Sequence, residues 1–198
     1  MVTKLKFGAV AGVVAPVLGF TCILTAVASY PAFSWTSNAL SDLGVAPGLT
    51  GPLFNFGLYA SGFLGFNFAV FALFTYFRKS LVGKTGASVF AAATVALIAI
   101  GVFNESFKGT HFAVSVALFV LGPLSMFIMT SAFLLGHQRR MAIFTLLIAI
   151  VAALPWILLF TFRYVKGVAI PETVSALAVS AWTITLCYVM AKQSRAAT

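Results

Sequence analysis

The chain has 198 residues, of which 62% are hydrophobic and only 8% are charged, and its mean hydropathy is +1.09. These values exclude a soluble globular protein, in which about 25% of the residues are charged. Because one membrane span needs about 20 apolar residues, six spans would use most of the chain. We therefore expect an all-α fold, a single polytopic bundle of six transmembrane helices that occupies residues 1–198.

The predicted spans are apolar runs separated by short polar breaks. In chain order they cover residues 7–30, 52–77, 86–103, 111–136, 141–162 and 172–191. The first run imitates a secretory signal, but its apolar core is longer than the roughly 7 to 15 residues of a signal peptide, so we expect it to be retained. Proline lies inside three spans, at Pro16, Pro123 and Pro155. Pro16 is expected to kink the first helix, and interrupted helices often line binding sites.

The basic residues predict the orientation of the bundle. One side carries nine of them, Lys4, Lys6, Arg78, Lys79, Lys84, Arg139, Arg140, Lys192 and Arg195, and the other carries three, Lys108, Arg163 and Lys166. Because Lys and Arg are enriched on the cytoplasmic side, we expect both termini in the cytoplasm and the protein in the cell membrane. The net charge of +9 is then explained by topology and by attraction to membrane lipid headgroups, and no nucleic-acid partner is expected.

Small residues recur at helical spacing in the first two spans. They are Gly8, Gly12, Ala15 and Gly19 in the first, and Gly57, Ser61 and Gly65 in the second. Such stripes let neighbouring helix backbones approach closely. We therefore expect both stripes to lie at helix contacts.

The segment 34–57 is the most polar stretch between two spans, and it holds the only aspartate, Asp42. The predicted topology puts all three acidic residues, Asp42, Glu105 and Glu172, on the outer face, one in each outer connection, with His111 beside them. We expect these four residues, with Asn38 and Asn55, to form one ligand-binding site, where Asn55 donates a hydrogen bond to Asp42 or to the ligand. The alternative is three separate acids at helix ends and in a loop, where they complement helix dipoles or are solvated.

Several sharper chemistries are not supported by the sequence. His111 and His137 lie 26 residues apart in one predicted helix, roughly 39 Å at 1.5 Å per residue, so they cannot share a metal or haem. A zinc site made from His111 and the acids is not indicated by the ligand spacing, and we predict neither a metal nor another cofactor. No phosphate loop, nucleophile elbow or zinc-protease motif is present, so catalytic residues cannot be assigned. Cys22 and Cys187 are predicted at different depths, too far apart for a disulfide.

Three strings in the chain resemble a known family. They are SNALSDLG from Ser37, LFNFGL from Leu53, and GVFNE from Gly101, which is followed by His111. In these strings the chain is similar to a family of archaeal and bacterial multi-pass membrane proteins called domain of unknown function 998. The resemblance covers nearly the whole chain and implies a bundle of about six helices, but no activity. Its first two strings include Asn38, Asp42 and Asn55.

Three classes of function fit the sequence. The first is a protein that binds or transports a small polar molecule or a lipid headgroup at the outer site. The second is a membrane-embedded enzyme that acts on lipid at the outer interface, with Asp42 and either Glu105 or Glu172 as acid and base. The third is an accessory subunit of a larger complex, packed against partner subunits or against further copies of itself.

Overall fold

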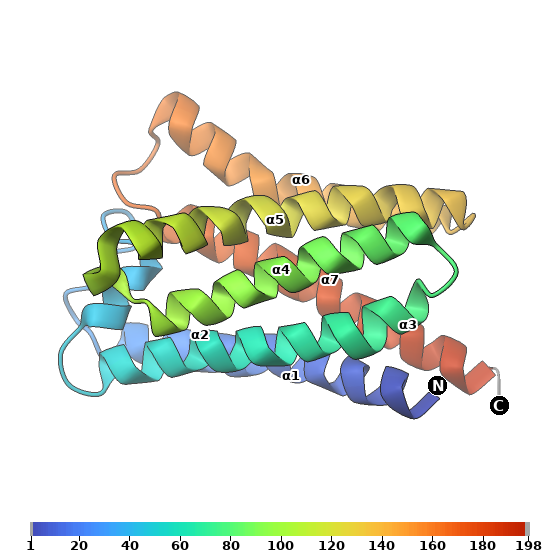
Figure 1. Ribbon diagram of the computed structural model, residues 1–198. Helices are drawn as coiled ribbons and strands as arrows, with labels where there is room; N and C mark the ends of the chain where they lie inside the picture. Colours follow the sequence, from blue (N-terminus) through green and yellow to red (C-terminus); the bar gives the residue numbers. More distant parts are fainter. Residues whose placement is uncertain (1, 197–198) are drawn as a thin grey trace.

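The computed structural model describes residues 2–196, and these are helical with short connections (Figure 1). The long helices are α1 (Val2–Ala28), α2 (Thr50–Asn67), α4 (Leu81–Val102), α5 (Lys108–Leu135), α6 (Arg139–Phe162) and α7 (Ala169–Ala196). Between them lie the 3₁₀ turns η1 (Leu40–Val45) and η3 (Glu105–Phe107), the π-helical turn η2 (Phe68–Leu73) and the short α3 (Phe74–Tyr76). Within the described chain, six helices are long and apolar enough to cross a membrane. The all-α class and the six predicted spans are confirmed.

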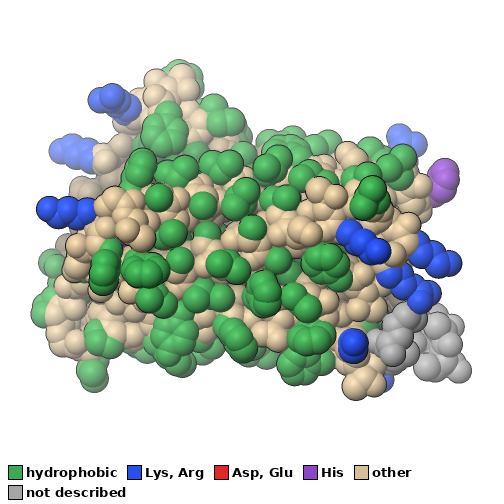
Figure 2. All heavy atoms as spheres, viewed as in Figure 1, with side chains coloured by type: hydrophobic (Ala, Val, Ile, Leu, Met, Phe, Trp, Pro, Cys, Tyr) green, Lys and Arg blue, Asp and Glu red, His purple; other side chains and the backbone are tan. Residues whose placement is uncertain are grey.

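The six spans form a ring in which each helix packs on the next in the chain, and α7 returns to α1. The start of α1 and the end of α7 lie at one end of the bundle, which we call the terminal end. The turns η1 and η3 and the α6–α7 connection lie at the opposite end, the loop end (Figure 1). In Figure 2 hydrophobic side chains cover the surface between these ends, and Lys and Arg gather at the ends themselves. This distribution is that of a multi-pass membrane protein.

Several helices extend beyond the predicted boundaries. One of them is α4, which begins at Leu81 rather than at residue 86. Ser80 caps this helix by accepting a hydrogen bond from the Gly83 backbone N–H at 3.0 Å. The added turn contains Lys84, which is compatible with a helix end because its long side chain can carry the charge out to the interface.

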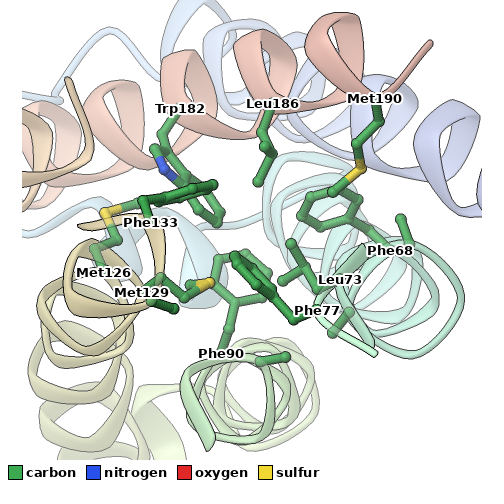
Figure 3. Close-up of a cluster of buried hydrophobic side chains, with 14 of the residues drawn as sticks. Phe68, Leu73, Phe77, Phe90, Met126, Met129, Phe133, Trp182, Leu186 and Met190 are labelled. Atoms are coloured by element: carbon green, nitrogen blue, oxygen red, sulfur yellow. The ribbon is translucent and has the colours of Figure 1, made fainter. Parts of the chain in front are cut away.

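The second span contains a π-helical turn that the sequence did not predict. The turn η2 joins α2 to α3 and contributes buried side chains to the main core, including Phe68 and Leu73. The Phe68 ring lies 5.9 Å from that of Phe90 and 6.4 Å from that of Trp182, both in edge-on geometry (Figure 3). The Trp182 indole N–H donates to Thr145 Oγ1 at 3.0 Å. This core therefore ties η2, α4, α6 and α7 together.

The small-residue stripes lie at helix contacts, as expected. The Ser61 hydroxyl donates to the Ala15 carbonyl of α1 at 2.9 Å, and a methyl group added to Gly19 would lie 2.7 Å from Ser61 Oγ. Gly57 faces Cys22 of α1 so closely that any side chain would overlap it. Gly65 instead faces Thr94 of α4, so the stripe of α2 packs against both α1 and α4.

The prolines and cysteines are accommodated within the helices. Pro16, Pro123 and Pro155 lie inside α1, α5 and α6. The last turns of α6 lean away from the other helices in Figure 1, which is the expected effect of a proline that removes one backbone hydrogen bond. Cys22 and Cys187 are buried and unpaired.

Candidate functional site

The α1–α2 connection folds across the loop end and is tied to the start of α7. The carbonyl of Thr36 accepts hydrogen bonds from the backbone N–H groups of Lys166 and Gly167, and that of Asn38 accepts from Val168 and Ala169, at 2.9 to 3.0 Å. The first N–H groups of a helix have no partner within it, and here the connection supplies partners. Gly167 lies so close to Asn38 that any side chain would overlap the backbone. The two connections thus form one packed layer.

Asp42 and Asn38 stabilise the turn η1 from within. Asp42 Oδ2 accepts from the Asn38 side-chain amide at 2.5 Å and from the Ala39 backbone N–H at 3.0 Å. The side-chain oxygen of Asn38 accepts from the Ser34 backbone N–H at 2.9 Å. These bonds hold η1 in position over the mouth of the bundle.

The structure brings all three acidic side chains together on η1. Glu172 Oε2 accepts from the Leu40 backbone N–H at 2.6 Å, and Glu105 Oε1 accepts from the Ser41 hydroxyl at 2.7 Å. The carboxyl groups of Glu105 and Asp42 lie close enough for their charges to interact, and Glu172 lies close enough to interact with both. The three acids therefore form one cluster.

His111 lies beside this cluster, on the first turn of α5. Its Nδ1 lies 2.8 Å from the Phe103 carbonyl and its Nε2 lies 3.5 Å from the Ser115 hydroxyl. The Phe103 carbonyl can only accept, so Nδ1 carries the proton in that contact. His111 is buried and near enough to Glu105 to interact with its charge. In the described chain no three His, Cys, Asp or Glu residues are arranged to hold a metal ion.

One of the two expected roles of Asn55, that of a donor to Asp42, is wrong. Its side-chain amide donates to the Gly44 carbonyl at 2.9 Å and is not bonded to Asp42. Asn55 lies one turn into α2, next to the last residues of η1, and a methyl group added to Gly44 would lie 2.6 Å from its side-chain oxygen. Asn55 therefore joins η1 to α2.

A cavity of about 200 Å³ opens beneath η1, in the interior of the bundle. Its walls come from α1, α2, α4, α5 and α7, and they are almost wholly apolar. At the loop end the lining includes Leu40, Ser41 and Glu172, and deeper in it includes Phe90 and Thr183. Glu172 and Thr183 are 11 positions apart on α7, roughly 16 Å, which is about half the ~30 Å hydrocarbon thickness of a bilayer.

Sequence reasoning missed the cavity, although two of its signals were visible. Pro16 and Pro123, which the sequence singled out as helix interruptions, both line it. Gly122 lines it as well, and a methyl group added there would meet no atom within 4 Å. Ser41 and Ser115 also line it. Nothing in the composition marks these hydroxyls, because serine is common in membrane helices without a ligand.

One family profile matches the chain, and it covers residues 13–189. The family is described as a protein of unknown function, DUF998. Neither the curated proteins nor the solved structures contain a match. The profile spans all six helices and includes Asn38, Asp42, Asn55, Glu105, His111 and Glu172. The chain therefore belongs to the DUF998 family of multi-pass membrane proteins.

Proposed function

We propose that the protein binds a small amphipathic, lipid-like molecule inside the bundle. The apolar part of the ligand occupies the interior cavity, and its polar end lies at the cluster of Asp42, Glu105 and Glu172. The observation that carries this proposal is the cavity itself, whose walls are apolar and whose loop end presents Glu172 and Ser41. Binding sites of this kind combine an apolar lining with a few placed polar groups.

The size of the cavity supports an occupant. An apolar cavity of about 150 Å³ in a soluble protein binds benzene, and this one is larger. At roughly 24 cal/mol per Å³, an empty void of this size would cost about 5 kcal/mol. Because domains have only about 5 to 15 kcal/mol of net stability, such a void is unusual unless a ligand fills it.

The polar end of the ligand should determine selectivity. Lipid tails are as apolar as the cavity wall, so a chain that leaves the bilayer gains little from the hydrophobic effect. Hydrogen bonds at η1 therefore have to distinguish the ligand from bulk lipid. The carboxyl groups there are positioned by backbone and serine donors, which pre-organises the site.

The site lies at the outer face of the cell membrane under this proposal. The loop end carries three basic residues and the terminal end nine, and the side with more Lys and Arg is cytoplasmic as a rule. The ligand is then a molecule of the outer leaflet or of the external medium.

A membrane-embedded enzyme is the second candidate. The closeness of the carboxyl groups of Asp42 and Glu105 favours it, since two neighbouring carboxyl groups can act as acid and base when one of them holds a proton. This candidate requires the bound molecule to change covalently. Mass spectra of the retained species before and after incubation should show a product with the wild type and none with Glu105→Gln.

The binding function can be tested with two glycine variants of α5. Gly122→Leu places a side chain in the cavity, where an added methyl meets no atom within 4 Å. Gly109→Leu is the matched control, because Gly109 is also unobstructed but does not line the cavity. Native mass spectrometry in mild detergent should detect a retained small amphiphile on the wild type and on Gly109→Leu, and none on Gly122→Leu. The same retained species on Gly122→Leu would contradict a ligand in the cavity.

A further inference from the structure

We infer that the cavity selects its ligand by charge, and that it takes a single-chain amphiphile whose polar end is an ammonium group. This inference rests on the proposed function and adds the chemical class of the ligand. It follows from the donors, acceptors and charges that surround the loop end of the cavity.

Among the described residues, the acidic groups at the loop end of the cavity have no Lys or Arg partner. Glu172 is the only ionisable residue among those that line the cavity, and Asp42 and Glu105 lie close to it. In the described part of the chain no Lys or Arg forms an ion pair with any of the three carboxyl groups. The three basic residues at this end of the bundle, Lys108, Arg163 and Lys166, are exposed. A buried carboxyl group either keeps its proton or ionises beside a counter-charge. No Lys or Arg is among the residues that line the cavity, so an ammonium group on the ligand would supply that counter-charge.

The free hydrogen-bonding positions at this end are acceptors. Glu172 is 8% exposed and uses one oxygen to accept from the Leu40 backbone N–H, while its other oxygen has no donor within residues 2–196. The donors nearby are already used, because Leu40 N–H donates to Glu172 and the Ser41 hydroxyl donates to Glu105. An ammonium group has donors and no acceptor, so it matches the free oxygens of Glu172 and Ser41. A phosphate or carboxylate would be repelled by any of the three carboxyl groups that ionises, and the Leu40 and Ser41 donors are already used.

The shape of the cavity limits the rest of the ligand. The cavity has a volume of only about 200 Å³, and it extends from Glu172 at the loop end to Thr183 and Phe90 in the interior of the bundle. Drug-sized pockets have roughly 300 to 1,000 Å³. A single alkyl chain fits this space, and a two-chain phospholipid does not.

Three probes with the same chain and different headgroups test the inference. Decylamine, 1-decanol and decanoate are each added to the purified full-length protein in maltoside detergent, and the retained fraction is measured by native mass spectrometry. Gly122→Leu and Gly109→Leu define the retention that is specific to the cavity. Glu172→Gln removes the charge but keeps an oxygen that can accept from Leu40.

We expect the wild type and Gly109→Leu to retain decylamine about tenfold more strongly than either other probe, as one charge-assisted hydrogen bond allows. The preference should disappear in Glu172→Gln, and retention of all three probes should be lost in Gly122→Leu. Equal retention, or a preference for decanoate, that is lost in Gly122→Leu would overturn the charge selection and leave the binding function intact. Retention that survives in Gly122→Leu would overturn both. If Glu172→Gln does not fold, the order of the three probes on the wild type still decides the inference.

Discussion

Gly167 lies where the α6–α7 connection passes against the backbone of Asn38, and it has no room for a side chain. We expect Gly167→Ala to separate the two connections and to lower stability by about 1 to 3 kcal/mol, as overpacking does. The measurement is the thermal unfolding temperature in detergent. Gly109→Ala is the control, because a methyl group there meets no atom within 4 Å. Equal unfolding temperatures for the two variants would show that the layer over the cavity is not held at Gly167.

At the same scale, the sequence predicted the meeting of the acids but not their partners. Asp42, Glu105 and Glu172 each lie at the end of a predicted span or in the connection beyond it, on the same predicted side of the membrane. Because the six spans form one bundle, residues at these positions lie close together at one end of it. Partners depend on side-chain directions within turns a few residues long. Asn55 therefore donates to the Gly44 carbonyl and not to Asp42. The rotation of α2 about its axis determines this partner, and the pattern of residue types does not reveal that rotation.

Among the elements, α1 and α2 pack closely along their small-residue stripes, and Ser61 lies in this contact. Ser61→Leu would place a larger side chain against Gly19 and Ala15 and remove the hydrogen bond to the Ala15 carbonyl. We expect a loss of about 2 to 4 kcal/mol, from overpacking of 1 to 3 and a hydrogen bond of about 1. Thermal unfolding in detergent measures it. Phe63→Leu, on the same helix but 60% exposed, should have little effect; a similar loss there would point to a general weakness of α2.

The long helices were predictable because their apolar length is a strong signal, whereas the short turns were not. Each of the six spans follows from the length that a bilayer demands. The π-helical turn η2 lies within a uniformly apolar run, Phe68–Leu73. A π-helical turn has about one residue more than an α-helical turn, and in such a run the extra residue leaves no mark on the apolar pattern. The cavity was not predictable for a similar reason, because it depends on how Pro16 of α1 and Gly122 and Pro123 of α5 are placed around the interior of the bundle.

For the whole molecule, the orientation in the membrane stays a prediction that labelling can test. Leu49 in the α1–α2 connection is 84% exposed and Leu81 at the start of α4 is 81% exposed; they lie at the loop end and the terminal end. The native cysteines, Cys22 and Cys187, are buried, so an introduced cysteine should dominate the labelling by a maleimide that cannot cross membranes. The wild type measures the remaining background.

Nine basic residues at the terminal end against three at the loop end predict that the terminal end is cytoplasmic. We therefore expect Leu49→Cys to react in intact cells and Leu81→Cys to react only after the membrane is permeabilised. The reverse pattern would put the acid cluster on the cytoplasmic side, and the ligand would then have to come from the inner leaflet or the cytosol. The cavity would keep its shape and charge in that case, because these depend on the fold, but its source of ligand would change.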